Sequence, residues 1–173
     1  PGPATTPPAA LAALTGCGVD AIDTPAAVVD LDAMERNLAR MADFARTRGL
    51  RWRPHAKMHK SAVLARRQIQ AGAVGVCVQK TAEAEALAAG GVSDIFISNE
   101  VLAPSKLRRV AALARALAAR GGRLALAVDS LGGVQALAAA FAAKGAGDEP
   151  ATGLIDVFIE IDDDPVYTVN GEH

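Results

Sequence analysis

Residues 74–99, VGVCVQKTAEAEALAAGGVSDIFISN, hold two short apolar runs on either side of an alanine-rich segment. The runs at 74–79 and 94–99 have the length and the branched side chains of buried strands, whereas residues 81–89 have the composition of a helix. A strand, a helix and a second strand in this order form a right-handed crossover between parallel strands. The stretch therefore predicts an α/β fold.

The same alternation extends in both directions from this unit. Apolar runs of strand length alternate with segments of helical periodicity, which is the pattern of a parallel sheet with covering helices. The further strands are predicted over residues 50–57, 123–130 and 154–162, and the further helices over residues 61–71, 104–119 and 132–144. Either a doubly wound sheet or a (β/α)8 barrel fits these units. Because the chain has no glycine-rich phosphate loop of the nucleotide-binding type, the barrel is favoured.

The two ends of the chain differ from this pattern. Residues 1–24 are rich in Pro, Ala, Gly and Thr and are predicted to form a loosely ordered arm, with no visible signal peptide. Residues 25–162 are predicted to form the barrel domain, which begins with a strand-like run at 27–31 and a helix capped by Asp32. Residues 163–173 are predicted to be an irregular tail. Five strands do not close a barrel, so the domain is expected to be an incomplete one.

The composition argues against several classes of protein. Hydrophobic residues make up 51% of the chain and charged residues 21%, with a net charge of −1, so a sizeable core can form. The near-neutral charge and the 3% of aromatic residues argue against nucleic acid or an anionic membrane as a partner. No apolar run reaches the roughly 20 residues of a membrane helix, and both cysteines are expected to be reduced thiols. We therefore expect a cytoplasmic protein with a small-molecule substrate.

The basic stretch at residues 51–60, RWRPHAKMHK, contains the strongest candidates for catalytic residues. If it stays extended, His55, Lys57 and His59 share one face, because side chains alternate with a period of two, and Arg53 lies further back on that face. Barrel enzymes place their active sites where strands run out into βα loops. A lysine there can form a Schiff base when it is neutral, and nearby cations favour that state. A solvated basic strand end would look similar, so spacing alone leaves both interpretations open.

Polar residues also end the next two strands. Gln79 ends the second strand, and Ser98 and Asn99 end the third. These positions suit contacts with a cofactor or a substrate, although caps of the following helices would use the same residues. Lys80 and Glu83 are interpreted as helix and surface residues.

Four segments occur together in an order that is typical of one family. They are TPAAVVDLDAMERNL at residues 24–38, RPHAKMHKS at 53–61, GVCVQKTAEAEAL at 75–87 and DIFISNEV at 94–101. Over roughly residues 22–162 the chain resembles the D-threonine aldolase family. These enzymes and the related D-serine dehydratases share the alanine racemase type of pyridoxal-phosphate fold. The resemblance implies a partial TIM barrel of the alanine racemase N-terminal type with about five βα units, without the family's C-terminal β domain.

The resemblance also assigns roles to single residues. It implies pyridoxal 5′-phosphate as the cofactor, with the Schiff base on Lys57. Lys57 is then a candidate catalytic residue, and His59 is a second one because of its place beside Lys57 in the basic stretch. Lys60 is expected to begin the next helix as a solvated residue. The candidate cofactor contacts are Lys57, His55, Arg53, Gln79 and Asn99.

Other site residues of the family have no counterpart in the sequence. Full-length members have eight barrel strands followed by a β domain that binds a divalent metal, and they are expected to form homodimers. The arginine that approaches the pyridine nitrogen, the phosphate-binding loops and the metal ligands are absent here, so no metal site is predicted. We therefore expect a truncated form with weak or no activity by itself.

Three functions follow from these observations. The first is a pyridoxal-phosphate-dependent lyase that cleaves D-3-hydroxy-amino acids to glycine and an aldehyde. The second is a D-serine dehydratase or an amino-acid racemase on the same scaffold. The third is a non-catalytic fragment that only binds pyridoxal phosphate.

Overall fold

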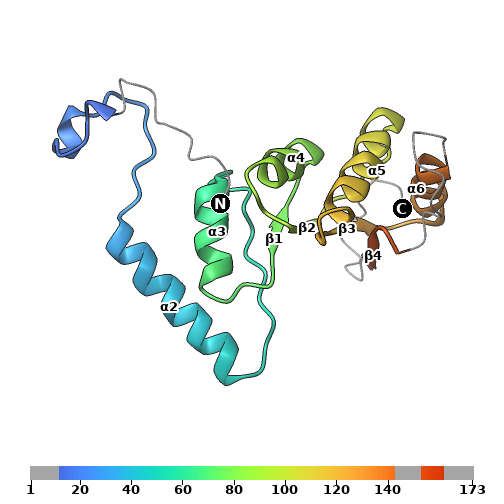
Figure 1. Ribbon diagram of the computed structural model, residues 1–173, viewed down its shortest axis with the longest axis horizontal. Coiled ribbons are helices and arrows are strands. Elements are labelled where there is room, and N and C mark those ends of the chain that lie inside the picture. The colour runs from blue at the N-terminus through green and yellow to red at the C-terminus, as the bar shows by residue number, and fades with distance from the viewer. Residues whose placement is uncertain (1–11, 143–152, 162–173) are drawn as a thin grey trace, which may run out of the picture.

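The predicted strands form one parallel sheet in a computed structural model of the protein, which describes residues 12–142 and 153–161 (Figure 1). The strands are β1 (Val76–Val78), β2 (Asp94–Ile97), β3 (Arg123–Val128) and β4 (Asp156–Ile159). They lie side by side in the order β1-β2-β3-β4, and every pairing is parallel. Consecutive parallel strands joined by helices form an open part of a barrel, so the predicted fold class is confirmed.

The helices between the strands have nearly the predicted bounds. They are α3 (Ala62–Gln70), α4 (Thr81–Ala89), α5 (Pro104–Ala118) and α6 (Leu131–Ala142). Each packs against the next, and α4 and α5 also contact the sheet. The core lies between sheet and helices, where alternate strand residues such as Val76, Ile95 and Leu124 meet helix residues such as Leu87 and Leu117. The period of two thus directs one side of every central strand to the helices.

The N-terminal part of the described chain lies apart from this sheet. A short 3-10 helix, η1 (Val19–Ala21), is followed by α2 (Leu31–Thr47), which stands off from the sheet in Figure 1. The predicted cap was wrong by two residues, because Asp30 and not Asp32 accepts the Ala33 amide at 2.9 Å. The strand-like run at 27–31 is not a strand, since no neighbouring strand pairs with it among the described residues.

The first predicted barrel strand, at residues 50–57, is reduced to a single bridge. His55 pairs in parallel with Cys77, and the carbonyls of Trp52 and Pro54 accept the amides of Val74 and Cys77 at 3.0 and 2.8 Å. The segment therefore runs beside β1 in the expected direction. Pro54 has no amide hydrogen to donate, which interrupts the ladder and explains why no regular strand forms.

Several predictions fall on residues outside the described ranges. These are residues 1–11 of the arm, the tail at 163–173 and the last residue of the fifth strand, Asp162.

Charged residues and phenylalanines occupy the sheet face that is turned away from the helices. Arg53 forms an ion pair with Asp94 at 2.8 Å, and Arg123 forms one with Asp156 at 2.6 Å. The rings of Phe96 and Phe158 lie 4.9 Å apart, measured between their centroids. They can meet because the residues of β3 between them on this face are alanines. This face would line the inside of a barrel.

Gly75 allows Arg53 to reach Asp94. A Cβ atom at position 75 would collide with the Arg53 guanidinium and would lie 2.5 Å from the Asp94 carbonyl oxygen. We expect Gly75→Ala to lower the free energy of unfolding by about 1–3 kcal/mol, the usual cost of overpacking a well-packed site. Urea denaturation of the two proteins would measure this difference.

Gly132→Ala is the matched control for this substitution. Gly132 lies in α6 and has nothing within 4 Å of the added Cβ atom. Alanine is also the better helix former, so this variant should be as stable as the parent chain or more stable. An equal decrease in the free energy of unfolding in the two variants would contradict the close contact of the Arg53 side chain with Gly75.

Candidate functional site

Lys57 lies in a turn at the carboxyl end of the sheet. The turn covers residues 56–59 and is closed by a hydrogen bond from the Lys60 amide to the Ala56 carbonyl at 2.8 Å. Ala56 is buried and donates its own amide to Cys77 of β1 at 2.7 Å, which fixes the turn to the strand end. The Lys57 side chain is exposed. A rigid strand thus presents an accessible amine at the edge where active sites of barrel proteins lie.

His55 connects the turn to the next strand. Its Nδ1 atom accepts the Lys57 amide at 3.2 Å, and its Nε2 atom lies 3.4 Å from Oγ of Ser98, which follows β2. Because Nδ1 is an acceptor, the hydrogen-bond network places the ring hydrogen on Nε2, which donates to Ser98. The Ser98 hydroxyl in turn donates to the Val78 carbonyl at 3.3 Å.

The surroundings of His55 favour its neutral form. Burial and the nearby charge of Lys57 lower the pKa of the imidazole, and they outweigh the opposite effects of Glu83 and Gln79. A neutral ring keeps Nδ1 available to the Lys57 amide, so the pKa and the hydrogen bonds agree.

Gln79 is the partner of the Lys57 amine. Lys57 Nζ donates to Gln79 Oε1 at 3.5 Å, which is a long hydrogen bond. Gln79 directly follows β1, as the sequence predicts, so strand β1 sets the position of its amide. The structure therefore brings together Lys57, His55 and Gln79, three of the six predicted site residues.

A pocket of about 310 Å3 lies beside this cluster. It is formed between the loops that lead into α4 and α5, and both Gln79 and Asn99 line it. Lys80 and Lys106 also line it, and neither forms an ion pair with another described residue. The space is at the lower end of the range for small-ligand sites.

Two predicted site residues lie elsewhere. Arg53 contacts Asp94 and the Val76 carbonyl, which mark the amino ends of β2 and β1, and so it lies at the opposite end of the strands from Lys57. His59 does not share a face with His55 and Lys57, because the chain turns at residues 56–59 instead of staying extended. Its Nδ1 atom accepts the Ser61 amide at 3.0 Å, and burial lowers its pKa.

Glu83 is close to the cluster although the sequence interpretation placed it on the surface. Its side chain is only 10% exposed, and its carboxylate accepts hydrogen bonds from Lys60 Nζ and from the amides of Gln79 and Lys80. The sequence does contain a sign of these amide contacts. Glu83 is the third residue of the helix that follows Lys80, and carboxylates at this position often accept hydrogen bonds from the amides that begin a helix. Its contact with Lys60 joins segments 23 residues apart and has no local signal.

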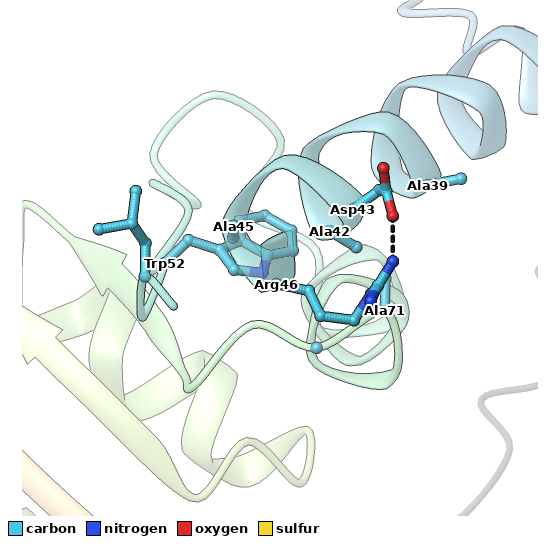
Figure 2. A pocket seen from close by; sticks show the side chains of 9 residues that line it. Ala39, Ala42, Asp43, Ala45, Arg46, Trp52 and Ala71 are labelled. Carbon is cyan, nitrogen blue, oxygen red and sulfur yellow. Dashed lines mark hydrogen bonds and ion pairs between the residues drawn. The ribbon is translucent and has the colours of Figure 1, made fainter. Parts of the chain in front are cut away.

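A second pocket has a volume of about 430 Å3 and does not include Lys57 in its lining. It is formed by the last turns of α2, by Leu50 and Trp52, and by the loop after α3. Figure 2 shows the Trp52 ring beside α2 and the ion pair of Asp43 with Arg46 at the rim. None of the predicted site residues lines this pocket.

Two kinds of feature are absent from the described ranges. No group of three or more His, Cys, Asp or Glu side chains there is arranged to hold a metal ion. No helix in the same ranges combines the length and the apolar character needed to cross a membrane.

Comparisons with known proteins agree with the fold and with the sequence resemblance. The 3-hydroxy-D-aspartate aldolase of Paracoccus denitrificans (strain Pd 1222) is 41% identical over 151 residues, which are 87% of this chain and 36% of that protein. The D-threo-3-hydroxyaspartate dehydratase of Delftia sp. (strain HT23) is 43% identical over 143 residues, or 83% and 34% of the two chains. The crystal structure of D-threonine aldolase from Filomicrobium marinum matches with a TM-score of 0.71 at 43% identity, covering 82% of this chain and 35% of that one.

The chain thus spans about a third of the length of these relatives. The family of the alanine racemase N-terminal domain matches residues 29–164, which is most of the chain. The protein therefore belongs to the alanine racemase N-terminal domain family.

Proposed function

We propose that this chain supplies the lysine-bearing part of a pyridoxal-phosphate-dependent lyase that acts on D-3-hydroxy-amino acids. The observation that carries the proposal is the position of Lys57. It presents an exposed amine next to Gln79 at the carboxyl end of the sheet, in a domain that is 41–43% identical to aldolases and a dehydratase.

The residues present offer partners for both the aldehyde and the phosphate of this cofactor. An aldehyde needs an amine partner, and Lys57 Nζ contacts only the neutral amide of Gln79 among the side chains described. A phosphate needs cations, and Lys80 and Lys106 line the adjacent pocket. We assign Lys57 as the covalent attachment point, with Gln79 and Asn99 as contacts at the pocket wall.

Each residue of the cluster has a separate task in this proposal. When bound, pyridoxal phosphate supplies an electron sink for the breaking of bonds at the substrate's α-carbon. Lys57 would hold the cofactor covalently at its aldehyde carbon through Nζ. Gln79 orients Nζ by accepting one of its hydrogens, and neutral His55 fixes the Lys57 backbone through Nδ1.

The names of the relatives support the substrate class. A 3-hydroxy-D-aspartate aldolase, a D-threonine aldolase and a D-threo-3-hydroxyaspartate dehydratase all act on D-amino acids with a hydroxyl group on the β-carbon. Cleavage between the α- and β-carbons to glycine and an aldehyde is the first candidate reaction. Loss of the β-hydroxyl group as water is the second, since the dehydratase is as similar to this chain as the aldolases are.

A chimera would test the proposal with the remaining two thirds of a relative's chain supplied. The segment of the Filomicrobium marinum aldolase that matches this chain would be replaced by residues 29–161. We expect the chimera to release glycine from D-threonine, and we expect Lys57→Ala to reduce this rate by at least about 1,000-fold because the covalent attachment is lost.

Lys60→Ala is the matched control in the same chimera. It removes a lysine from the same turn and should leave most of the glycine release. A folded chimera that binds no pyridoxal phosphate, or a Lys57→Ala chimera that is as active as its parent, would contradict the proposal.

A further inference from the structure

Two lysines on the same turn have different partners. Within the part of the chain that the structure describes, Lys57 Nζ forms its one hydrogen bond with the neutral Gln79 amide, whereas Lys60 Nζ forms an ion pair with Glu83. The Glu83 side chain is 10% exposed, so its carboxylate is largely removed from water. An ammonium group held by such a carboxylate would have to lose both its proton and its partner before it could attack a carbonyl carbon.

Glu83 also fixes the loop on which Gln79 lies. While one carboxylate oxygen faces Lys60, the other accepts the Gln79 amide at 3.0 Å and the Lys80 amide at 3.2 Å. One side chain of α4 therefore connects the turn that carries Lys57 with the loop that carries its hydrogen-bond partner.

The backbone at Lys60, next to the contact with Glu83, has a conformation that is rare for residues other than glycine. Lys60 has a φ of 50°, and it is the one residue other than glycine with a positive φ within the described ranges. Side chains disfavour this left-handed conformation, so surrounding contacts must offset its cost. Two contacts can offset this cost: the ion pair of Lys60 with Glu83, and the hydrogen bond from the Lys60 amide to the Ala56 carbonyl.

We propose that Glu83 is a positioning residue that anchors the Lys57 turn to α4 and engages Lys60, so that of the two lysines on this turn only Lys57 remains available to an aldehyde. The proposal rests on the proposed function, because it explains which lysine the cofactor takes. It goes beyond that function, because Glu83 itself touches neither Lys57 Nζ nor the adjacent pocket.

The Glu83 carboxyl group is ionised at neutral pH. Burial by itself would raise the pKa of the carboxyl group, but the hydrogen bond from Lys60 and the amides of Gln79 and Lys80 outweigh it and keep the pKa below its usual value. The charge also raises the pKa of His55, against the lowering by burial and by Lys57. Removal of the Glu83 charge should therefore be visible at His55 even without a cofactor.

The test compares Glu83→Gln with Glu85→Gln. Both residues lie on α4, and each forms an ion pair, Glu83 with Lys60 and Glu85 with Arg109. Each substitution therefore removes one negative charge from one ion pair. Each chain would be incubated with pyridoxal phosphate, reduced with borohydride and mapped by mass spectrometry. We expect the ratio of label at Lys60 to label at Lys57 to rise roughly tenfold in Glu83→Gln, the factor given by a typical charge-assisted hydrogen bond, and to stay at the parent value in Glu85→Gln.

Two cofactor-free measurements accompany the mapping. The imidazole pKa of His55, followed by NMR, should fall in Glu83→Gln and stay unchanged in Glu85→Gln. The amides of Gln79 and Lys80 should exchange with deuterium faster in Glu83→Ala than in Glu85→Ala, because only the first variant loses their acceptor.

The outcomes separate the two proposals. An unchanged label ratio in Glu83→Gln, or equal amide exchange in the two alanine variants, would overturn the role of Glu83. If the parent chain takes label at neither lysine, the proposed function fails, and the amide exchange still decides whether Glu83 anchors the turn.

Discussion

Replacing Lys57 by alanine should abolish the visible absorbance band that pyridoxal phosphate gives when it is bound to the chain. The band requires a covalent bond to an amine, and Lys57 is the exposed lysine whose Nζ meets a neutral amide at the carboxyl end of the sheet. The expected loss is complete, because the remaining contacts are non-covalent. Because the side chain is exposed, the variant should fold as the parent does.

Lys60→Ala and Lys80→Ala are the controls for this result. Lys60 is held by Glu83, and Lys80 extends from the pocket rim, so neither variant removes the attachment point. Both should keep the absorbance band, with weaker binding in Lys80→Ala if this lysine meets the phosphate. A band of parental intensity in Lys57→Ala would contradict the assignment.

The isolated 173-residue chain should self-associate through the outer strand of its sheet. All four residues of β4 are exposed, and the exposed fractions of Phe158, Ile159 and the adjacent Ile161 are 56%, 76% and 80%. An unpaired strand edge with apolar side chains is a template for pairing with another chain. We expect sedimentation velocity at tens of micromolar, a typical concentration for such association, to show oligomers and not a monomer.

Val157→Lys combined with Ile159→Lys should weaken this association by roughly tenfold or more, because lysines on an edge strand oppose pairing. Leu131→Lys is the matched control. Leu131 is 72% exposed but lies in α6 and not in β4, so its substitution should leave the association unchanged. A stable, compact monomer of the parent chain under these conditions would contradict the prediction.

The sequence predicted the sheet because its strands are mostly apolar, with charges at the first residues of β2, β3 and β4, and its helices are regular. The run at 74–79 and the segment at 81–89 became β1 and α4 within two residues of the expected bounds. The apolar residues of a strand and of a helix recur with different periods, so the two elements can be told apart. Strands that alternate with helices along the chain are joined by crossovers, which makes the strands parallel. Strand 50–57 was overestimated because Pro54 removes a donor, a local effect that the apolar pattern does not display.

The site was only partly predictable. Gln79 follows from its place at a strand end, and Lys57 from the family resemblance. His59 was placed by assuming an extended chain, whereas the chain turns at residues 56–59. Arg53 contacts Asp94 at the amino end of β2, at the opposite end of the strands from Lys57. The role of Glu83 depends on its contact with Lys60, and no short-range pattern encodes a contact across 23 residues.

Borohydride reduction of the chain with pyridoxal phosphate, followed by peptide mapping, tests the central claim most directly. The claim is that Lys57, fixed by His55 and directed by Gln79, is the residue to which the cofactor attaches. It predicts one pyridoxyl group per chain, located on Lys57 and absent from Lys57→Ala. Label located on Lys60 or Lys80 in place of Lys57 would contradict it.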